Sequence, residues 1–460
     1  MLNYLLALAC LAAWAGCATV PEQSNFPEIS VPVTWTTTLD DHAAPQAWLN
    51  DFNSAALNRM VQEALGSNAD IRIAVARVSQ SIAEAAIVGA DSLPVADLGL
   101  GGKRQKINNF GPQSIDVVRF ENYAFNLNIS WELDLWGRLR NRSSAALAQL
   151  EASQAELEGA RLSLAAQVSK RWFDYIEARQ QLQLAENTAQ NYRDNTAALE
   201  ARFNRGLVEG LDLRRIRTQS AGADADVQRR HRILDQATRR LEVLLGRYPA
   251  AQLPAVDVLP ALPVRIPVGL PSDLIQRRPD LVAAERRLAA SDQAWSASRK
   301  DLLPAIRLTS SGGSASQDFS DLLDQDFSVW SFGGNLAQPI FQGGRIRASI
   351  DRSASLREQA AAKYHNVALQ AFLEVEVTLA AEARLLHEFN QLQRASVEAG
   401  AAETLAWKRY RNGTLDFLNT LDAQRTANRA RSTLLALRNQ LLQNRVDLYL
   451  ALGGPFQPAS

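Results

Sequence analysis

Residues 122–134 read NYAFNLNISWELD, and apolar and polar side chains alternate along this stretch without a break. The odd positions carry the apolar and aromatic residues Tyr123, Phe125, Leu127, Ile129, Trp131 and Leu133. Because successive side chains of a β-strand point to opposite faces, the stretch predicts a strand with one apolar face and one polar face. A half-buried strand of a soluble protein usually has about 5 to 6 residues. The length and the aromatic ends favour a transmembrane strand, which takes about 9 to 11 tilted residues.

The chain repeats itself at a nearly fixed offset. Residues 203–206 (FNRG) match residues 410–413 (YRNG), 207 positions later, and Leu245-Gly246 matches Leu452-Gly453 at the same offset. Upstream, Leu93-Pro94 matches Leu303-Pro304 at 210, so an indel of three residues lies in the hairpin. A unit of this length is too long for a solenoid repeat, which indicates tandem duplication of a whole assembly.

The repeat predicts the domain organisation. Repeat 1 spans residues 54–248 and repeat 2 spans 271–454, joined by a linker at 249–270 that is rich in proline. An irregular segment at 17–53 precedes repeat 1, and residues 455–460 form a short tail. Each repeat contains one β-hairpin, at about 94–134 and about 304–341. In repeat 2, Gly333-Gly334 and Pro339 disturb the alternation, so we expect a bend or an edge there.

Four strands cannot close a barrel, and open strand edges cannot face lipid because their N–H and C=O groups would be unpaired. Single-chain outer-membrane barrels begin at about eight strands. The strand count therefore predicts an oligomer, and three chains would supply twelve strands. In each copy, residues 94–105 and 122–134, or 304–314 and 326–341, would form the pair, and the first pair is linked by a polar stretch.

Long helices follow each hairpin. Residues 143–204 and 346–411 contain no proline, and about 60 helical residues make a rod of roughly 90 Å. Apolar residues recur at steps of three and four, the spacing of a coiled-coil seam. A returning helix follows each rod after a glycine-containing turn, and shorter helices at 54–92 and 271–302 precede the hairpins. The rods alone would equally suit a coiled-coil scaffold or adaptor.

The N-terminus has the features of an export signal. Residues 1–16 form an apolar run that ends in small residues, as in a cleaved signal peptide. The run is shorter than the roughly 20 residues of a membrane-spanning helix, and we expect no such run elsewhere in the chain. The sequence before Cys17 resembles a bacterial lipobox, so Cys17 is a candidate for lipidation, with plain cleavage as the alternative.

Composition and motifs exclude several classes of function. The 49 basic and 49 acidic residues leave no net charge, which argues against a nucleic-acid partner. The four histidines are scattered without metal-ligand spacing. There is no nucleophile elbow, phosphate loop or dinucleotide fingerprint. We expect a non-enzymatic protein without metal or cofactor, apart from a covalent lipid on Cys17.

Several strings together resemble the outer membrane factor family. They are WELDLWGRLRNR at 131–142, QRRPDLVAAERRLAASDQA at 276–294, LLPAIRL at 302–308, QPIFQGGRIRA at 338–348 and YRNGTLDFLNTLDAQR at 410–425. The resemblance implies a homotrimer in the outer membrane, in which a twelve-stranded barrel continues into a helical periplasmic barrel. It also implies an exit duct for a tripartite efflux pump or for type I secretion, with a periplasmic adaptor and an inner-membrane transporter as partners.

The same resemblance places a gate at the periplasmic tip of the helices. The turns at Gly206 and Gly413 would form this tip. The family's gating positions then correspond to Asp212 and Asp422, with Arg425 one helical turn beyond Asp422 as a candidate partner in closing contacts. In a trimer, threefold repetition would make each of the two aspartates a ring of acidic side chains. Asn419 occupies a position where some members carry aspartate, which weakens the expectation of a gate with two such rings. The alternative for each of these residues is a solvated side chain on a coiled-coil face.

Overall fold

The computed structural model describes residues 35–36, 47–110, 115–254, 258–263 and 271–455. The expected signal peptide at 1–16 and the lipidation candidate Cys17 lie outside the described residues, as do most of the segment 17–53 and residues 456–460.

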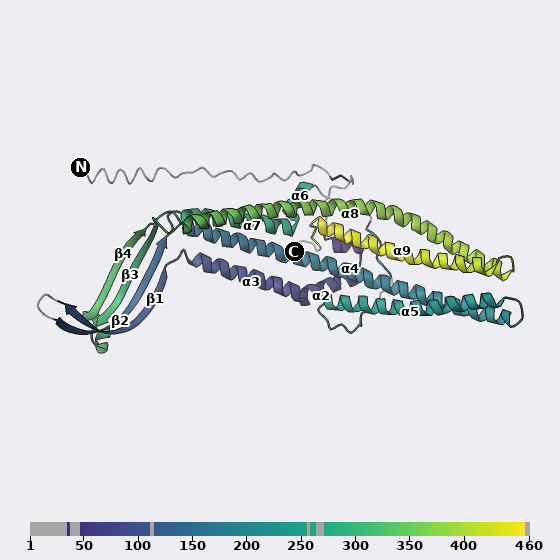
Figure 1. Ribbon diagram of the computed structural model, residues 1–460, viewed down its shortest axis with the longest axis horizontal. Helices are drawn as coiled ribbons and strands as arrows, with labels where there is room; N and C mark the ends of the chain where they lie inside the picture. The colour runs from purple at the N-terminus through teal and green to yellow at the C-terminus, as the bar shows by residue number, and fades with distance from the viewer. Residues whose placement is uncertain (1–34, 37–46, 111–114, 255–257, 264–270, 456–460) are drawn as a thin grey trace. The chain divides into compact units, whose positions relative to one another are not determined.

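Four antiparallel strands form one sheet in the order β1-β2-β3-β4 (Figure 1). They are β1 (Val95–Phe110), β2 (Ile115–Leu133), β3 (Ala305–Ser316) and β4 (Ser328–Ala337). The hairpins β1-β2 and β3-β4 belong to repeats 1 and 2, and the pairing of β2 with β3 joins the repeats. Phe125 lies opposite Leu100 and Leu127 lies opposite Leu98, so the apolar parity of β2 continues onto β1.

The first hairpin is longer than the sequence predicted. The polar stretch expected to link its strands instead continues the ladder, from Lys103 opposite Asn122 to Phe110 opposite Ile115. Antiparallel pairing satisfies backbone N–H and C=O groups whatever the side chains are, so polar residues do not end the strands. In the second hairpin β4 ends at Ala337, two residues before Pro339, where the sequence predicted an interruption.

Two helical hairpins carry the long rods. The rods are α4 (Arg138–Phe203) and α8 (Arg345–Arg411), with 66 and 67 residues, or about 100 Å each at 1.5 Å per residue. The helix α5 (Gly210–Leu244) returns along α4, and α9 (Phe417–Ala451) returns along α8 (Figure 1). Contacts between α4 and α9 join the two hairpins.

The shorter helices before each hairpin are broken, so the expectation of continuous helices at 54–92 and 271–302 was wrong. Repeat 1 has α2 (Ala55–Ser67) and α3 (Ala69–Ala90), and repeat 2 has α6 (Pro271–Arg277) and α7 (Pro279–Lys300). The residues at the breaks are Asn68 and Arg278, and both have extended backbone conformations. Proline at position 279 disfavours a helical Arg278. Asn68 ends one helix and caps the next by accepting a hydrogen bond from the Asp70 N–H.

Both breaks bind the end of a returning helix in the same way. The Asn68 side chain donates to the Leu244 carbonyl at 3.1 Å, and the Arg278 guanidinium donates to the Ala451 carbonyl at 3.2 Å. These carbonyls stand 207 residues apart and belong to the last turns of α5 and α9, where helix carbonyls lack partners within the helix. The two repeats are therefore equivalent in their contacts as well as in their sequence.

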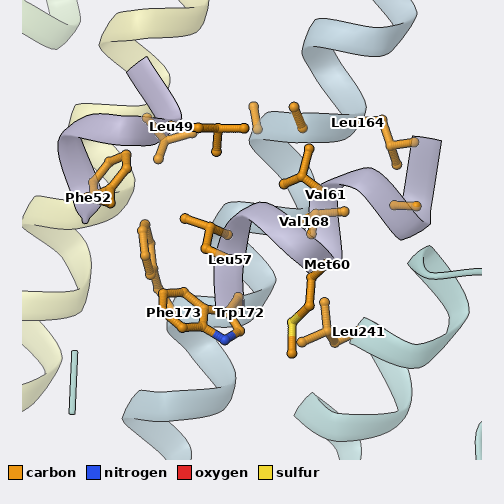
Figure 2. Close-up of a cluster of buried hydrophobic side chains, with 14 of the residues drawn as sticks. Leu49, Phe52, Leu57, Met60, Val61, Leu164, Val168, Trp172, Phe173 and Leu241 are labelled. Atoms are coloured by element: carbon orange, nitrogen blue, oxygen red, sulfur yellow. The ribbon is translucent and has the colours of Figure 1, made fainter. Parts of the chain in front are cut away.

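The main apolar core lies where α2 crosses the middle of α4 (Figure 2). Leu57 and Val61 of α2 pack with Val168 and Phe173 of α4 in one buried cluster. The short helix η1 (Trp48–Phe52) adds aromatic contacts, since Trp48 stacks on Tyr449 with ring centroids 5.6 Å apart. The helix η1 is thus fixed to both helical hairpins, through Tyr449 of α9 and Phe173 of α4.

A buried ion pair fixes the linker between the repeats. Arg445 of α9 and Glu382 of α8 lie 2.5 Å apart, with side chains only 2% and 3% exposed. Arg445 also donates to the Pro263 carbonyl at 2.7 Å, and Asn444 donates to Glu382 at 2.8 Å. Removing one member of such a pair leaves an uncompensated buried charge.

One helix in the described part of the chain, α3, is long and apolar enough to cross a membrane by length and composition, with a mean hydropathy of 1.3. From the sequence we expect no such segment after residue 16, so α3 differs from this expectation. None of the residues in its apolar window is buried within this chain.

We predict that Glu382→Ala destabilises the helical body by about 3–5 kcal/mol, because Arg445 would remain buried without its partner. Thermal and denaturant unfolding followed by circular dichroism in detergent measure the change. The matched control is Glu388→Ala, since Glu388 is an exposed residue on the same helix. Equal effects of the two substitutions would contradict the prediction.

Candidate functional site

The apolar face of the sheet forms the first part of the candidate site. Phe125, Leu127, Ile129 and Trp131 are exposed in the single chain, whereas Tyr123 and Leu133 are half-buried. Tyr123 meets Phe319 edge to face, with ring centroids 5.7 Å apart. Neighbouring strands extend the face, with Leu98, Leu100, Trp330 and Phe332 all exposed. A contiguous apolar patch of this kind marks a surface that another apolar phase covers.

The opposite face of β2 is polar. It carries Asn122, Asn126, Asn128, Ser130 and Glu132, as the alternation predicts. The structure therefore places apolar and polar side chains on opposite sides of one sheet, which is the arrangement of a barrel wall between lipid and a wet lumen.

Charged residues join the sheet to the helices. Asp134, just after β2, accepts from the backbone N–H groups of Leu139 and Arg140, and so caps the start of α4. Arg138 pairs with Glu132 at 2.5 Å and with Asp301 at 3.5 Å. Trp136 donates its indole N–H to the Pro304 carbonyl at 2.7 Å. The strand end of repeat 1 is thus bound to the helix end of repeat 2.

The turns at Gly206 and Gly413 connect the helices of each hairpin. Their φ angles are +72° and +70°, in the left-handed region that favours glycine. In both turns the glycine N–H bonds a carbonyl three residues earlier. The sequence predicted these turns, and the backbone conformation explains the glycines.

A buried cluster of aromatic and aliphatic side chains joins the two turns. Tyr192 and Leu199 of α4, Leu213 and Ile216 of α5, and Phe417 and Leu421 of α9 form one buried group. The guanidinium of Arg202 lies over the Tyr410 ring at 5.1 Å and so links the last turn of α4 to the last turn of α8. Sequence reasoning missed Arg202 and Tyr410, because no spacing rule pairs residues from different repeats.

The structure separates the four gate candidates. Asp212 is half-buried on α5 and lies 3.8 Å from Arg215. Burial raises the pKa of Asp212; Arg215 opposes the rise, and the charges of Glu209 and Asp416 add to it. Asp212 of repeat 1 and Asp416 of repeat 2 therefore act on each other across the two turns.

The remaining candidates lie on α9. Asn419 donates its backbone N–H to Asp416 at 2.7 Å, and Asp416 caps the start of α9. Asp422 and Arg425 are both exposed, and neither belongs to an ion pair within the described part of the single chain. The sequence offered a signal for Asp416, since aspartate directly before an apolar helix start is a common cap.

Among the described residues, no group of three or more His, Cys, Asp or Glu side chains could hold a metal ion. A groove of about 550 Å³ near the tip lies among Arg202, Glu403, Trp407 and Tyr410, and both polar and apolar side chains line it.

Known proteins match this architecture along nearly the whole chain. The profile of the family described as "Outer membrane efflux protein" matches residues 60–247 and 270–454. The chain is 32% identical to the probable efflux pump outer membrane protein TtgC of Pseudomonas putida, over 99% of this chain and 96% of that protein. It is 30% identical to the cation efflux system protein CusC of Escherichia coli, over 98% and 99% of the two chains.

A solved structure agrees with the sequence relatives. The outer-membrane channel OprN superposes with a TM-score of 0.86 at 29% identity, covering 94% of this chain and 99% of that one. The fold class expected from the sequence is confirmed, with four strands per chain joined to long helices. The two faces of the sheet and the long helices are the features expected of this family, and the matches cover nearly the whole chain. The chain belongs to the outer membrane efflux protein family and is an outer-membrane channel of an efflux pump.

Proposed function

We propose that three copies of this chain form a passive exit duct, with a twelve-stranded barrel in the outer membrane and a helical tunnel in the periplasm. The observation that carries the proposal is the open four-stranded sheet with one exposed apolar face. Its edge strands β1 and β4 each have only one neighbour in the chain. Unpaired edges are not tolerated in lipid, and three sheets of four strands close the ring.

The duct would be non-enzymatic and would need no metal or cofactor. Its lumen would be lined by the polar face of β2 and its neighbours, which supports a wet passage. Energy for transport would come from an inner-membrane transporter, reached through a periplasmic adaptor. The relatives TtgC and CusC are named for efflux, CusC for cations. Small molecules or ions are therefore the proposed cargo, ahead of secreted proteins.

We predict that the protein stays in the membrane when salt or carbonate is applied, leaves it only with detergent and then runs as a trimer. In planar bilayers it should form ion-conducting pores. A soluble periplasmic scaffold would instead be released without detergent. Monomeric protein in the carbonate supernatant would end the duct proposal.

We propose further that the tip is the gate. Asp212 and Asp416 come from different repeats, and threefold repetition would concentrate their carboxylates together with those of Asp422. Rings of acidic side chains in a narrow pore select cations. Because Asp422 and Arg425 have no ion pair within the described residues of one chain, they are available for closing contacts between chains. Asn419 is engaged by Asp416 and contributes no charge.

We predict that Asp422→Ala and Arg425→Ala each increase single-channel conductance severalfold, because each removes a contact that holds the tip closed. Planar-bilayer recording measures the change. Arg429→Ala is the matched control, since Arg429 is also exposed on α9, one helical turn beyond Arg425. Conductance of the first two variants at the level of the control would contradict the gate.

Lipidation of Cys17 is the remaining proposal, and it rests on the lipobox-like residues that precede this cysteine. We predict that the mature wild-type chain carries acyl chains on residue 17, and that Cys17→Ser removes them. Intact-mass spectrometry of the purified protein measures this difference. The variant should still need detergent for extraction, because the barrel rather than the lipid holds the protein in the membrane. A wild-type mass equal to that of the unmodified mature chain would contradict lipidation.

A further inference from the structure

Repeat 1 contacts repeat 2 along one seam within the chain. In the sheet, β2 pairs with β3, and in the helical part α4 packs against α7. At the junction of these two parts, Arg138 and Arg142 approach Asp301 at 3.5 and 3.3 Å. This intramolecular seam shows how one repeat binds the next.

The strand registers establish which residues are equivalent in the two repeats. Val95 of β1 lies opposite Ser130 of β2, and Ala305 of β3 lies opposite Ala337 of β4. A shift of 210 residues for the first strand and 207 for the second converts one pair into the other. The same shifts convert α3 into α7 at both ends, and they convert α4 into α8 except that α8 has one more residue at its C-terminal end. The equivalence is therefore fixed to the residue.

Within the described part of the chain, no repeat packs on the corresponding surfaces of repeat 2 and repeat 1, and these surfaces are exposed. The helix α7 packs between α4 and α8, whereas its equivalent α3 packs along α4 on one side. The side of α3 that would face the next copy carries exposed Ile73 and Ile87, whose equivalents in α7, Ala283 and Ala297, are buried. On α8, exposed Leu356 lies in the stretch up to residue 366, which is equivalent to the part of α4 along α7, where Gly159 faces Pro279. A second copy whose α8 lies against this α3 would cover Ile73 and Ile87, as α7 is covered between α4 and α8 within the chain.

We infer that the seam between two copies reproduces the seam within one chain, so that β4 pairs with β1 of the next copy in a defined register and Arg345 forms an ion pair with Asp91 of the partner subunit. This inference rests on the proposed trimeric duct and specifies how its chains join. The equivalent of the pair Ile129–Ser310 is Leu336 opposite Leu100 of the partner subunit. The equivalent of Arg138–Asp301 is the Arg345 pair.

The inferred register keeps the apolar face continuous. Leu336 and Leu100 both belong to the apolar parity of their strands, and a slip of one residue would send one of them into the lumen. The register also preserves a close approach. Within the chain, a Cβ on Gly313 would lie 2.8 Å from the Cα of Asn126, so this position needs glycine. At the equivalent position across the interface, Gly333 of β4 lies opposite Lys103 of the partner subunit. This pair also contains one glycine, which β4 supplies instead of the strand equivalent to β3.

Charge mapping selects one ion pair from the seam. Five seam pairs within the chain are Arg138–Asp301, Arg142–Asp301, Arg286–Glu151, Arg287–Glu156 and Arg307–Glu132. Their equivalents across the inferred interface, in the same order, combine Arg345 with Asp91, Ser349 with Asp91, Glu358 with Ala76, Lys363 with Arg77 and Pro339 with Asp97. Only the first keeps opposite charges. Both of its members are exposed in the single chain, which leaves them accessible to a partner.

Charge reversal tests the ion pair in the detergent-solubilised, full-length protein. We predict that Arg345→Asp and Asp91→Arg each lower the temperature at which the trimer dissociates by several degrees, and that the two substitutions combined recover most of the loss. The control is Arg347→Glu, because Arg347 is exposed nearby and its equivalent, Arg140, pairs with Asp134 away from the seam. A double variant no more stable than the single ones would overturn the pair.

Cross-linking tests the register. Ser331→Cys with Gln105→Cys should give covalent dimers and trimers on a denaturing gel after oxidation. The matched pair Ala124→Cys with Ala315→Cys occupies the equivalent positions within one chain and should give only monomers. The shifted pair Ser331→Cys with Arg104→Cys should cross-link poorly. Preferential cross-linking of the shifted pair in an intact trimer would overturn the register but leave the duct standing, whereas monomeric wild-type protein in detergent would overturn both.

Discussion

The constraint on which this structure depends is that backbone N–H and C=O groups cannot remain unpaired in lipid. A chain with a four-stranded sheet cannot meet this requirement alone, because β1 and β4 each lack one neighbour. The apolar parity of β2 commits the sheet to a lipid-facing position, and the strand count commits the chain to partners. Because the apolar face places the sheet in lipid, where its edge strands need partners, the same face makes oligomerisation necessary.

Duplication doubles the number of strands that one chain contributes to the ring. Each repeat carries one hairpin, one rod and one returning helix, and each binds the next through equivalent elements. The hydrogen bonds from Asn68 to Leu244 and from Arg278 to Ala451 show how far this equivalence extends, since different side chains satisfy equivalent carbonyls. A ring of three chains then contains six similar units. Such a ring needs only one type of seam, repeated within and between chains.

The sequence predicted the elements better than their interruptions. Alternation over residues 122–134 identified β2 and both of its faces, and the lack of proline identified the rods. The break at Arg278 was readable from Pro279, but the break at Asn68 depends on a cap and on a carbonyl 176 residues away. The extension of β1 to Phe110 was not predicted either, because polar side chains outside the apolar zone carry no periodic signal. The contacts at the tip join residues from different repeats, and local patterns do not report them.

Function in this protein should reside where the two repeats differ, because equivalent positions can only support the ring. The buried pair Arg445–Glu382 has Thr238 and Tyr175 at the equivalent positions of repeat 1. Repeat 2 therefore holds the linker through a buried ion pair, whereas Tyr175 of repeat 1 holds it through a hydrogen bond to the Pro254 carbonyl at 3.0 Å. At the tip, Asp212 is equivalent to Asn419, and Arg215 is equivalent to Asp422. The two turns thus carry different charges at equivalent positions, and the charge of Asp416 acts on Asp212. In the proposed gate, two identical turns would place like charges at every seam. The exchange of Arg215 for Asp422 between the repeats would instead let one turn attract the next, and competition for these charges would open the tip.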